Sequence, residues 1–256
     1  MKLARWWLPL ALLLIWQGLS MAGVLPAYKL PSPWAVIQGF GELAVKGMPP
    51  GQLLQWHLLY SLLRVGIGFL AAALIGVPLG LALGAFAPLR GAINPIIEVL
   101  RPVPPLAWIP IAILWFGIGL PSAGFIIFLG AFFPIVLNTT AGVLEVNPVL
   151  VEAVRTLGAG RREIVSKVLL PGSLPNIFVG VRVGLGIGWM TLVAAEFTGV
   201  RSGYGLGYMI MTARDIQRPD EIIAGMAVIG LVGLGIDWLV RLAQRRLVPW
   251  RDGGGA

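Results

Sequence analysis

The sequence predicts an all-α membrane protein of about six transmembrane helices, and three observations carry this prediction. Of its 256 residues, 57% are apolar and only 12% are charged, about half the charge of an average soluble domain. The mean hydropathy of +0.88 excludes intrinsic disorder, because disordered chains are poor in apolar residues. Charged residues also divide the chain into long neutral runs, and a bilayer is crossed by roughly 20 apolar residues in a helix.

The first neutral run follows Lys2 and Arg5 and predicts a retained transmembrane helix over residues 6–28. A cleaved signal peptide is the alternative, because the stretch Ser20-Met21-Ala22 loosely resembles a cleavage site. Within a single transmembrane domain over residues 1–256, five further spans are expected. They cover residues 65–89, 104–118, 122–144, 176–199 and 222–240.

Residues 102–144 form a run of 43 residues without a charge, which is long enough for two spans. Their turn is expected at residues 117–122, where glycine and proline gather. Just before this run, Pro102, Pro104 and Pro105 remove backbone donors, so the chain is expected to bend at the cytoplasmic surface. Residues 90–100 carry apolar residues at helical spacing, which favours an interfacial helix, with a plain loop as the alternative.

The positions of the basic residues orient the chain. Membrane proteins carry an excess of Lys and Arg in their cytoplasmic loops. Arg64 and Arg182 lie at or within predicted helices and are set aside; with a cytoplasmic N-terminus, 12 of the other basic residues lie inside and 5 outside, which places both termini in the cytoplasm. The sequence pI of about 10.6 therefore reflects topology, and nucleic-acid binding is not expected. The inside set is Lys2, Arg5, Arg90, Arg101, Arg155, Arg161, Arg162, Lys167, Arg241, Arg245, Arg246 and Arg251, and the outside set is Lys29, Lys46, Arg201, Arg214 and Arg218.

Two predicted spans carry stripes of small residues at a spacing of four. Such stripes lie on one face of a helix and let neighbouring backbones approach closely in lipid. We expect both faces to be buried against other helices. The stripes are Ala72, Gly76, Gly80 and Gly84, and Gly180, Gly184 and Gly188.

The residue inventory excludes several kinds of chemistry. The chain has no Cys and one His, so a metal centre is not expected. None of its four lysines follows a glycine as in a phosphate-binding P-loop, so the chain is not expected to be an enzyme that hydrolyses ATP. His57 is expected to be structural, and the glycines of residues 203–207 are expected to form a tight external turn, because they follow a membrane helix and not a strand.

Ionisable residues within spans are costly and mark candidate functional positions. Arg182, Glu196 and Asp237 meet this description. Arg182 and Asp237 are expected at a similar depth, and Asp237 also has Arg241 one helical turn later. Glu196 lies toward the outer half of its span, at a depth comparable with that of Arg64, and a gate, a substrate-lining group and an ion pair all remain open.

Residues 145–175 form the longest charged cytoplasmic segment. They predict two short helices, over 149–157 and 161–169, separated by Gly158-Ala159-Gly160 and ended by Pro171 and Pro175. Such a pair is too short to form a domain, so its apolar face calls for a protein partner or for lipid. The apolar residues expected to be exposed are Val151, Val154, Leu157, Ile164 and Val168.

The sequence EAVRTLGAGRREIVSKVLLPGSLP at residues 152–175 resembles the EAA loop of the inner-membrane permeases of ABC importers. That pattern has Glu-Ala-Ala, a glycine four positions later, and an Ile-x-Leu-Pro ending. Val154 and Val168 replace an alanine and the isoleucine. The matching positions are Glu152, Ala153, Gly158, Leu170 and Pro171.

Three further segments are similar to the taurine, alkanesulfonate and nitrate branch of this family, and most of all to the taurine permeases. They are residues 101–119, residues 180–196 and the GLGYMI sequence at residues 205–210. The resemblance implies a type I ABC importer permease, a helical membrane protein with a cytoplasmic helix-turn-helix coupling loop. It also implies a permease homodimer in the bacterial inner membrane, two ATPase subunits that bind ATP and Mg, and a periplasmic substrate-binding protein. The chain itself would bind no cofactor.

By the same resemblance, Glu152, Ala153 and Gly158 would lie in a cleft of the ATPase. The coupling residues as a whole would be Glu152, Ala153, Gly158, Arg161, Leu170 and Pro171. The solute, taurine or another sulfonate with nitrate as an alternative, would pass between the two copies. Candidate residues along its path are Trp189, Thr191, Glu196 and Arg182.

Two other classes of function remain alternatives. A secondary transporter coupled to protons through Glu196 would explain a carboxylate inside a span, but it leaves the EAA-like loop without a role. An intramembrane enzyme would need a catalytic set near Glu196 or Asp237, and His57 alone does not supply one.

Overall fold

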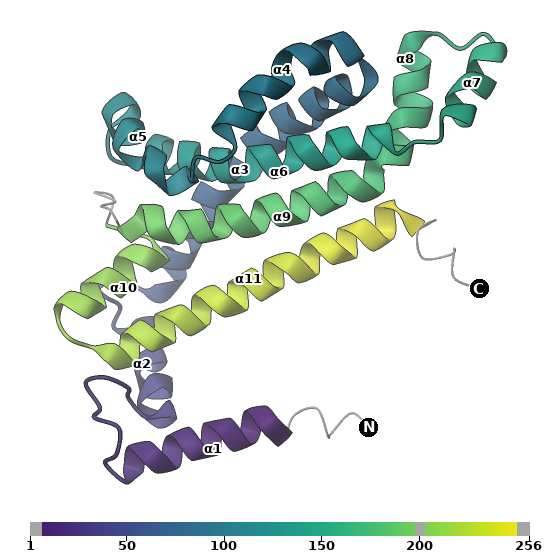
Figure 1. The fold of residues 1–256 in the computed structure, drawn as a ribbon. Coiled ribbons are helices and arrows are strands. Elements are labelled where there is room, and N and C mark those ends of the chain that lie inside the picture. Colours follow the sequence, from purple (N-terminus) through teal and green to yellow (C-terminus); the bar gives the residue numbers. More distant parts are fainter. Residues whose placement is uncertain (1–6, 198–202, 250–256) are drawn as a thin grey trace. The chain divides into compact units, whose positions relative to one another are not determined.

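The computed structural model describes residues 7–197 and 203–249, and all the regular structure in this part of the chain is helical (Figure 1). Charge positions Lys2, Arg5, Arg201 and Arg251 and the last two residues of the span expected at 176–199 lie outside the described residues. The helices in chain order are α1 (Trp7–Met21), α2 (Pro33–Val45), α3 (Leu54–Ala85), α4 (Ala87–Leu100), a 3₁₀ turn (Pro105–Trp108), α5 (Ile109–Phe116), α6 (Leu120–Leu144), α7 (Pro148–Thr156), α8 (Arg161–Ile164), a π-helical turn (Val165–Leu169), α9 (Leu170–Phe197), α10 (Leu206–Asp215) and α11 (Pro219–Leu247).

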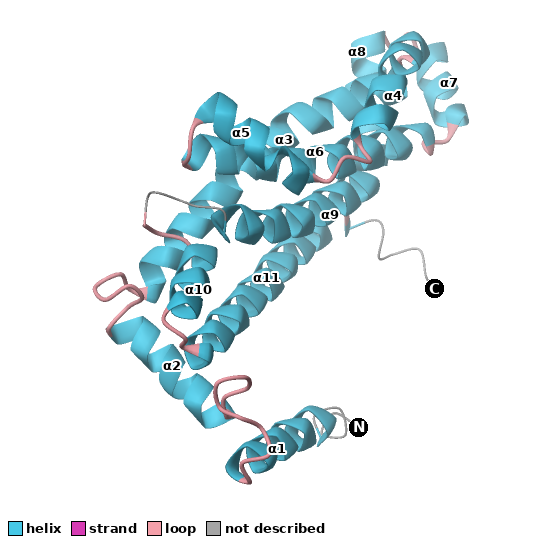
Figure 2. Ribbon diagram, turned by 60° about the vertical axis from the view of Figure 1, so that its left-hand side comes forward, coloured by secondary structure: helices cyan, strands magenta, loops and turns pink. Residues whose placement is uncertain are grey.

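The chain divides into two compact units. The first unit comprises residues 1–62 and 196–232, and the second comprises residues 63–195 and 233–256. The first therefore contains α1, α2 and α10, and the second contains α4 to α8 (Figure 2). Helices α3, α9 and α11 contribute residues to both.

Helix α6 is the centre of the second unit. Its residues Ala131, Ile135 and Val136 have no exposed surface. Ala72 of α3 packs with Ala131 and Ile135, and Leu83 of α3 packs with Val136 and with Ile97 of α4. The core of this unit is therefore built around a helix that is covered by α3, α4 and α9.

The small residues of α3 and α9 allow this close packing. A Cβ atom added at Gly80 would lie 2.6 Å from the Cβ of Thr139, and one added at Gly184 would lie 2.8 Å from the carbonyl oxygen of Ala131. The Thr140 hydroxyl also donates to the Gly80 carbonyl across 3.2 Å. The expectation that both stripes are buried against other helices is confirmed. The glycines that approach α6 are Gly76, Gly80 and Gly84 of α3 and Gly180, Gly184 and Gly188 of α9.

The first unit is held together by an ion cluster at the start of α11. The Arg218 guanidinium donates to carboxylate oxygens of Glu42 in α2 and of Asp220, and lies 3.0 Å from the Glu221 carboxylate. The Arg218 hydrogen bond, with help from Lys46, lowers the pKa of Glu42 from 4.5 to about 2. Glu42 is therefore ionised at neutral pH and ties α2 to the N-terminal end of α11.

Four helices of the described residues are long and apolar enough to cross a membrane. They are Leu54–Ala85, Leu120–Leu144, Arg161–Phe197 and Pro219–Leu247. The spans expected at 122–144 and 222–240 fall within the second and fourth of these. The span expected at 65–89 begins earlier, because Arg64 is accommodated inside α3 with only 2% of its surface exposed. Helix α1 has 15 residues, so the first span stays a prediction.

The third span, expected over 104–118, coincides with a 3₁₀ turn and α5, which together cover Pro105–Phe116. This segment is bent by 84° relative to α4, as in a broken span or a re-entrant loop, so the third span stays a prediction. The bend falls at the prolines that were expected to break the helix. The interfacial helix expected at 90–100 is confirmed as helical, and it starts at Ala87 because Pro88 suits the first turn.

Adding one methyl group to α3, by replacing a glycine with alanine, tests how closely α3 packs on α6. We expect Gly80→Ala to lower the midpoint of thermal unfolding of the purified protein by an amount that corresponds to about 1–3 kcal/mol of overpacking. Gly66→Ala is the matched control on the same helix, since a Cβ there has no neighbouring atom within 4 Å, and its midpoint should stay level or rise. Equal midpoints for the two variants would refute close packing at Gly80.

Candidate functional site

The predicted helix pair at residues 145–175 is present as α7 and α8, and we call residues 147–164 the hairpin. The Asn147 side chain accepts the Val149 N–H at 2.9 Å and caps α7, and Pro148 occupies its first turn. Gly158 has φ +85°, and its N–H donates to the Arg155 carbonyl at 2.9 Å. Glycine adopts this left-handed backbone conformation more readily than other residues do. The Gly158-Ala159-Gly160 segment therefore follows the end of α7, as expected.

The inner face of the hairpin is anchored on the membrane helices. Val143, Ile164 and Leu169 form a buried cluster, and Val151, Val154, Leu81 and Ala85 pack against it. The expectation that Val151, Val154, Ile164 and Val168 are exposed is therefore wrong, since Ile164 is only 7% exposed and the other three are half-buried. Val151, Val154 and Ile164 pack against the ends of α3 and α6, which sequence spacing alone does not reveal.

The outer face of the hairpin is open. Glu152 and Ala153 are exposed, and so are three apolar side chains, Val149 at 68%, Leu150 at 55% and Leu157 at 86%. Of the residues expected to be exposed, Leu157 is thus confirmed. An apolar patch with a carboxylate beside it is typical of a protein-binding surface.

Between the hairpin and the junction of α3 with α4 lies a cavity of about 580 Å³. Glu152, Arg155 and Arg161 are its charged lining residues. Glu152 therefore lies at the edge of the hairpin, exposed to solvent and also bordering this cavity together with Arg161, which was expected to take part in coupling.

Pro171 and Pro175 do not end the second helix, which corrects the expected boundary at residue 169. The chain from Arg161 to Phe197 is helical throughout, with a π-helical turn over Val165–Leu169 just before Pro171. Local π geometry is one way in which membrane helices accommodate prolines. The Ser173 hydroxyl also donates to the Leu170 carbonyl at 3.1 Å within this helix. Leu170 and Pro171 thus join the hairpin to α9 without a break.

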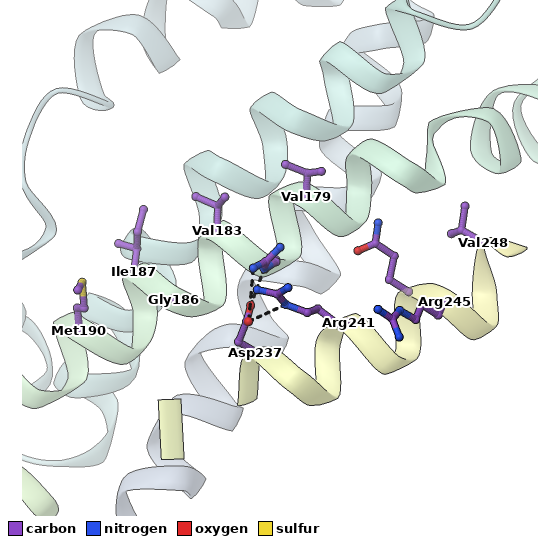
Figure 3. A pocket seen from close by; sticks show the side chains of 11 residues that line it. Val179, Val183, Gly186, Ile187, Met190, Asp237, Arg241, Arg245 and Val248 are labelled. Carbon is purple, nitrogen blue, oxygen red and sulfur yellow. Dashed lines mark hydrogen bonds and ion pairs between the residues drawn. The ribbon is translucent and has the colours of Figure 1, made fainter. Parts of the chain in front are cut away.

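A groove of about 710 Å³ lies between α9 and the C-terminal part of α11 in the second unit (Figure 3). Arg182 donates from Nε to Oδ1 of Asp237 at 2.5 Å, and Arg241 donates from Nε to Oδ2 at 2.8 Å. Arg182 and Arg241, which the sequence offered as alternative partners of Asp237, both pair with it.

The other candidate pathway residues lie elsewhere. Trp189 is 7% exposed and lines a small cavity of about 70 Å³ with Arg182 and Asp237. Thr191 is 5% exposed, and its hydroxyl donates to the Gly188 carbonyl at 3.0 Å within α9. Arg182 and Trp189 thus line one cavity.

Glu196 organises the first unit. It is 1% exposed and accepts the Ser61 hydroxyl at 2.8 Å and the Gly207 N–H at 2.8 Å. The Leu206 N–H donates in turn to Oγ of Ser61 at 2.9 Å. These amides belong to the first turn of α10, where a negative charge is stabilising, so Glu196 caps that helix.

His57 belongs to the same arrangement and has a structural role. It is fully buried, and its Nδ1 accepts the Gly205 N–H at 3.0 Å. Gly203 and Gly205 have positive φ values of 70° and 149°, which confirms the predicted turn. Sequence analysis missed α10 and the role of Ser61, because only the glycine pair marks the start of that helix.

Comparisons with known proteins agree with this architecture. Residues 65–253 match the family described as "Binding-protein-dependent transport system inner membrane component". The chain is 40% identical to the taurine transport system permease protein TauC of Escherichia coli (strain K12), over 93% of this chain and 86% of that protein. It is 40% identical to the putative aliphatic sulfonates transport permease protein SsuC of Bacillus subtilis (strain 168), over 96% and 86%.

Two further relatives extend the comparison. The nitrate import permease protein NrtB of Leptolyngbya laminosa is 37% identical, over 93% of this chain and 85% of that protein. Among solved structures, a chain of the MetNI methionine ABC transporter in an inward-facing conformation is similar, with a TM-score of 0.55, 26% identity, and coverage of 86% of this chain and 97% of that chain.

The cap on α10 gives a direct test of the Glu196 interpretation. Glu196→Ala leaves the Gly207 N–H and the Ser61 hydroxyl without their acceptor, so we expect amide hydrogen exchange in α10 to accelerate by about tenfold or more, from the loss of roughly 1–3 kcal/mol per buried donor. Glu196→Gln keeps an acceptor oxygen and should have a smaller effect. Unchanged exchange in Glu196→Ala would show that the carboxylate does not hold α10.

Proposed function

Because the chain belongs to the family of binding-protein-dependent transport system inner membrane components, we propose that it forms the membrane path of an ATP-driven importer for taurine or another sulfonate. The solute moves from the periplasm to the cytoplasm across the bacterial inner membrane, and both termini of the chain are cytoplasmic. The chain is an ABC importer permease of the taurine, sulfonate and nitrate branch, and nitrate is the alternative solute.

The proposal assigns ATP hydrolysis to partner subunits. Two ATPase subunits bind ATP and Mg and dock on the hairpins of a permease homodimer, while a periplasmic binding protein delivers the solute and lipid surrounds the spans. The observation that carries this assignment is the hairpin itself, whose inner face is anchored on α3 and α6 and whose outer face exposes Glu152, Ala153 and Leu157. The MetNI transporter gives general support for an ATPase partner and a dimer.

The local geometry suggests how docking would be coupled to the membrane. Glu152, Ala153 and Gly158 present the contact surface, and Arg161 lies beside Glu152 around one cavity. Leu170 and Pro171 carry the helix onward into α9. Movement of the ATPase would then turn the hairpin and α9 as a rigid body, which is a common way of switching between inward-facing and outward-facing states.

Reconstitution of the chain with its ATPase and binding protein in vesicles tests the function as a whole. We expect uptake of labelled taurine that requires ATP and all components, with competition by other sulfonates. Stronger competition by nitrate would change the assigned solute. Uptake by the chain alone would overturn the ABC mechanism in favour of a secondary transporter.

Gly158 tests the coupling role of the hairpin. Proline cannot adopt the φ of +85° found there, so we expect Gly158→Pro to reduce co-purification of the ATPase and ATP-dependent uptake at least tenfold, while membrane insertion stays normal. Two alanine variants provide a matched comparison, because Gly158 and Gly160 both have space for a Cβ but only Gly158 has a positive φ. Gly158→Ala should weaken ATPase association more than Gly160→Ala. Normal association and uptake in Gly158→Pro would count against the role.

A further inference from the structure

The groove between α9 and α11 carries a net positive charge (Figure 3). Its ionisable lining residues are Arg182, Asp237, Arg241 and Arg245, so three positive charges and one negative charge leave +2. Arg182 and Arg241 share Asp237. Arg245 has no ion-pair partner in the part of the chain that the structure describes. The groove therefore holds more arginine than its own carboxylate neutralises.

These charges are accessible. The side chains of Arg182 and Arg241 are 42% and 53% exposed, and that of Asp237 is 33% exposed. An anion can therefore approach the guanidinium groups without displacing packed side chains. The volume of about 710 Å³ is within the range of small-molecule binding sites, roughly 300–1,000 Å³.

The remaining lining combines an apolar wall with a polar end. Val179, Val183, Ile187 and Met190 recur along α9 at spacings of four and three residues, and Gln244 adds an amide beside Arg241 and Arg245. A guanidinium offers several N–H donors in one plane, which suits groups with two or more negatively charged oxygens. The groove thus matches a ligand with a compact oxyanion and a short apolar body.

We propose that this groove is a transit site for the transported anion, in which Arg241 and Arg245 hold a sulfonate group and Asp237 competes with that group for Arg182 and Arg241. The inference rests on the proposed import function and adds the residues that meet the solute. An internal carboxylate weakens anion binding, and a transit site must bind the solute strongly enough to admit it and weakly enough to release it.

The chain has no cysteine, so a single introduced thiol can be labelled selectively. The rates at which it reacts with anionic and cationic reagents report the electrostatic potential in the groove. Val183→Cys places one thiol in the wall of the groove, at a position that is 44% exposed. In nanodiscs of neutral lipid, the assembled transporter is treated with sulfonatoethyl methanethiosulfonate, an anion, or with its trimethylammonioethyl analogue, a cation. We expect the ratio of anionic to cationic reaction rates to exceed the ratio for Val45→Cys at the end of α2, a position that is 79% exposed and lies outside the groove.

Charge changes then identify the residues responsible. Arg241→Gln and Arg245→Gln should each lower the rate ratio for Val183→Cys about threefold, and Asp237→Asn should raise it by a similar factor, as expected for charges separated by several ångströms near water. Arg246→Gln is the matched control, because Arg246 is exposed on the same helix but does not line the groove. An excess of ethanesulfonate should slow both reagents in the parent variant and lose this effect in Arg245→Gln.

The result can overturn the proposal in two ways. If Arg241→Gln and Arg245→Gln leave the ratio of anionic to cationic reaction rates unchanged, the arginines do not set the electrostatic potential of the groove. Protection by anionic phospholipid in the nanodisc but not by ethanesulfonate would assign the groove to a lipid headgroup. Neither measurement depends on ATP-driven uptake, so failure of the transit site is distinguishable from failure of the import function.

Discussion

Close packing of α3 and α9 on α6 is the constraint on which the rest of the second unit depends. Lipid gives helices no hydrophobic reason to associate, so they are held by backbone proximity and by van der Waals contact. Glycines on both neighbours of α6 provide that proximity, and side chains of α6 such as Thr139 and Ile135 occupy the space that Cβ atoms would take. The hairpin packs against α3 and α6, and α9 supplies one wall of the groove.

The same packing gives the hairpin its mechanical role. Val151 and Val154 lie against the ends of α3 and α6, while the helix that begins at Arg161 continues through a π-helical turn into α9. A surface on the hairpin is therefore connected to a membrane span by both packing and covalent continuity. Glu196 has a separate role in the first unit, where its carboxylate caps α10.

The sequence predicts well the features that depend on local chemistry. Long neutral runs locate α6 and α11, glycine at residue 158 locates the end of α7, and glycine spacing identifies the buried faces of α3 and α9. Features that depend on residues far away in the sequence were either not predicted or predicted wrongly. Ser61 meets Glu196 across 135 residues of sequence, and Ile164 is buried by helices that spacing within the hairpin does not indicate.

The central claim is that the hairpin and α9 move as one body, and a reversible cross-link tests it most directly. Val146 is the residue immediately before the hairpin, and a Cβ placed at Gly172 of α9 would lie 3.8 Å from its Cβ. This separation suits a disulfide between the base of the hairpin and α9, and the chain has no cysteine of its own. The measurement is ATP-dependent solute uptake by the Val146→Cys/Gly172→Cys transporter before and after oxidation. The account predicts equal uptake in both states, whereas uptake that is lost on oxidation and restored by reduction would contradict it.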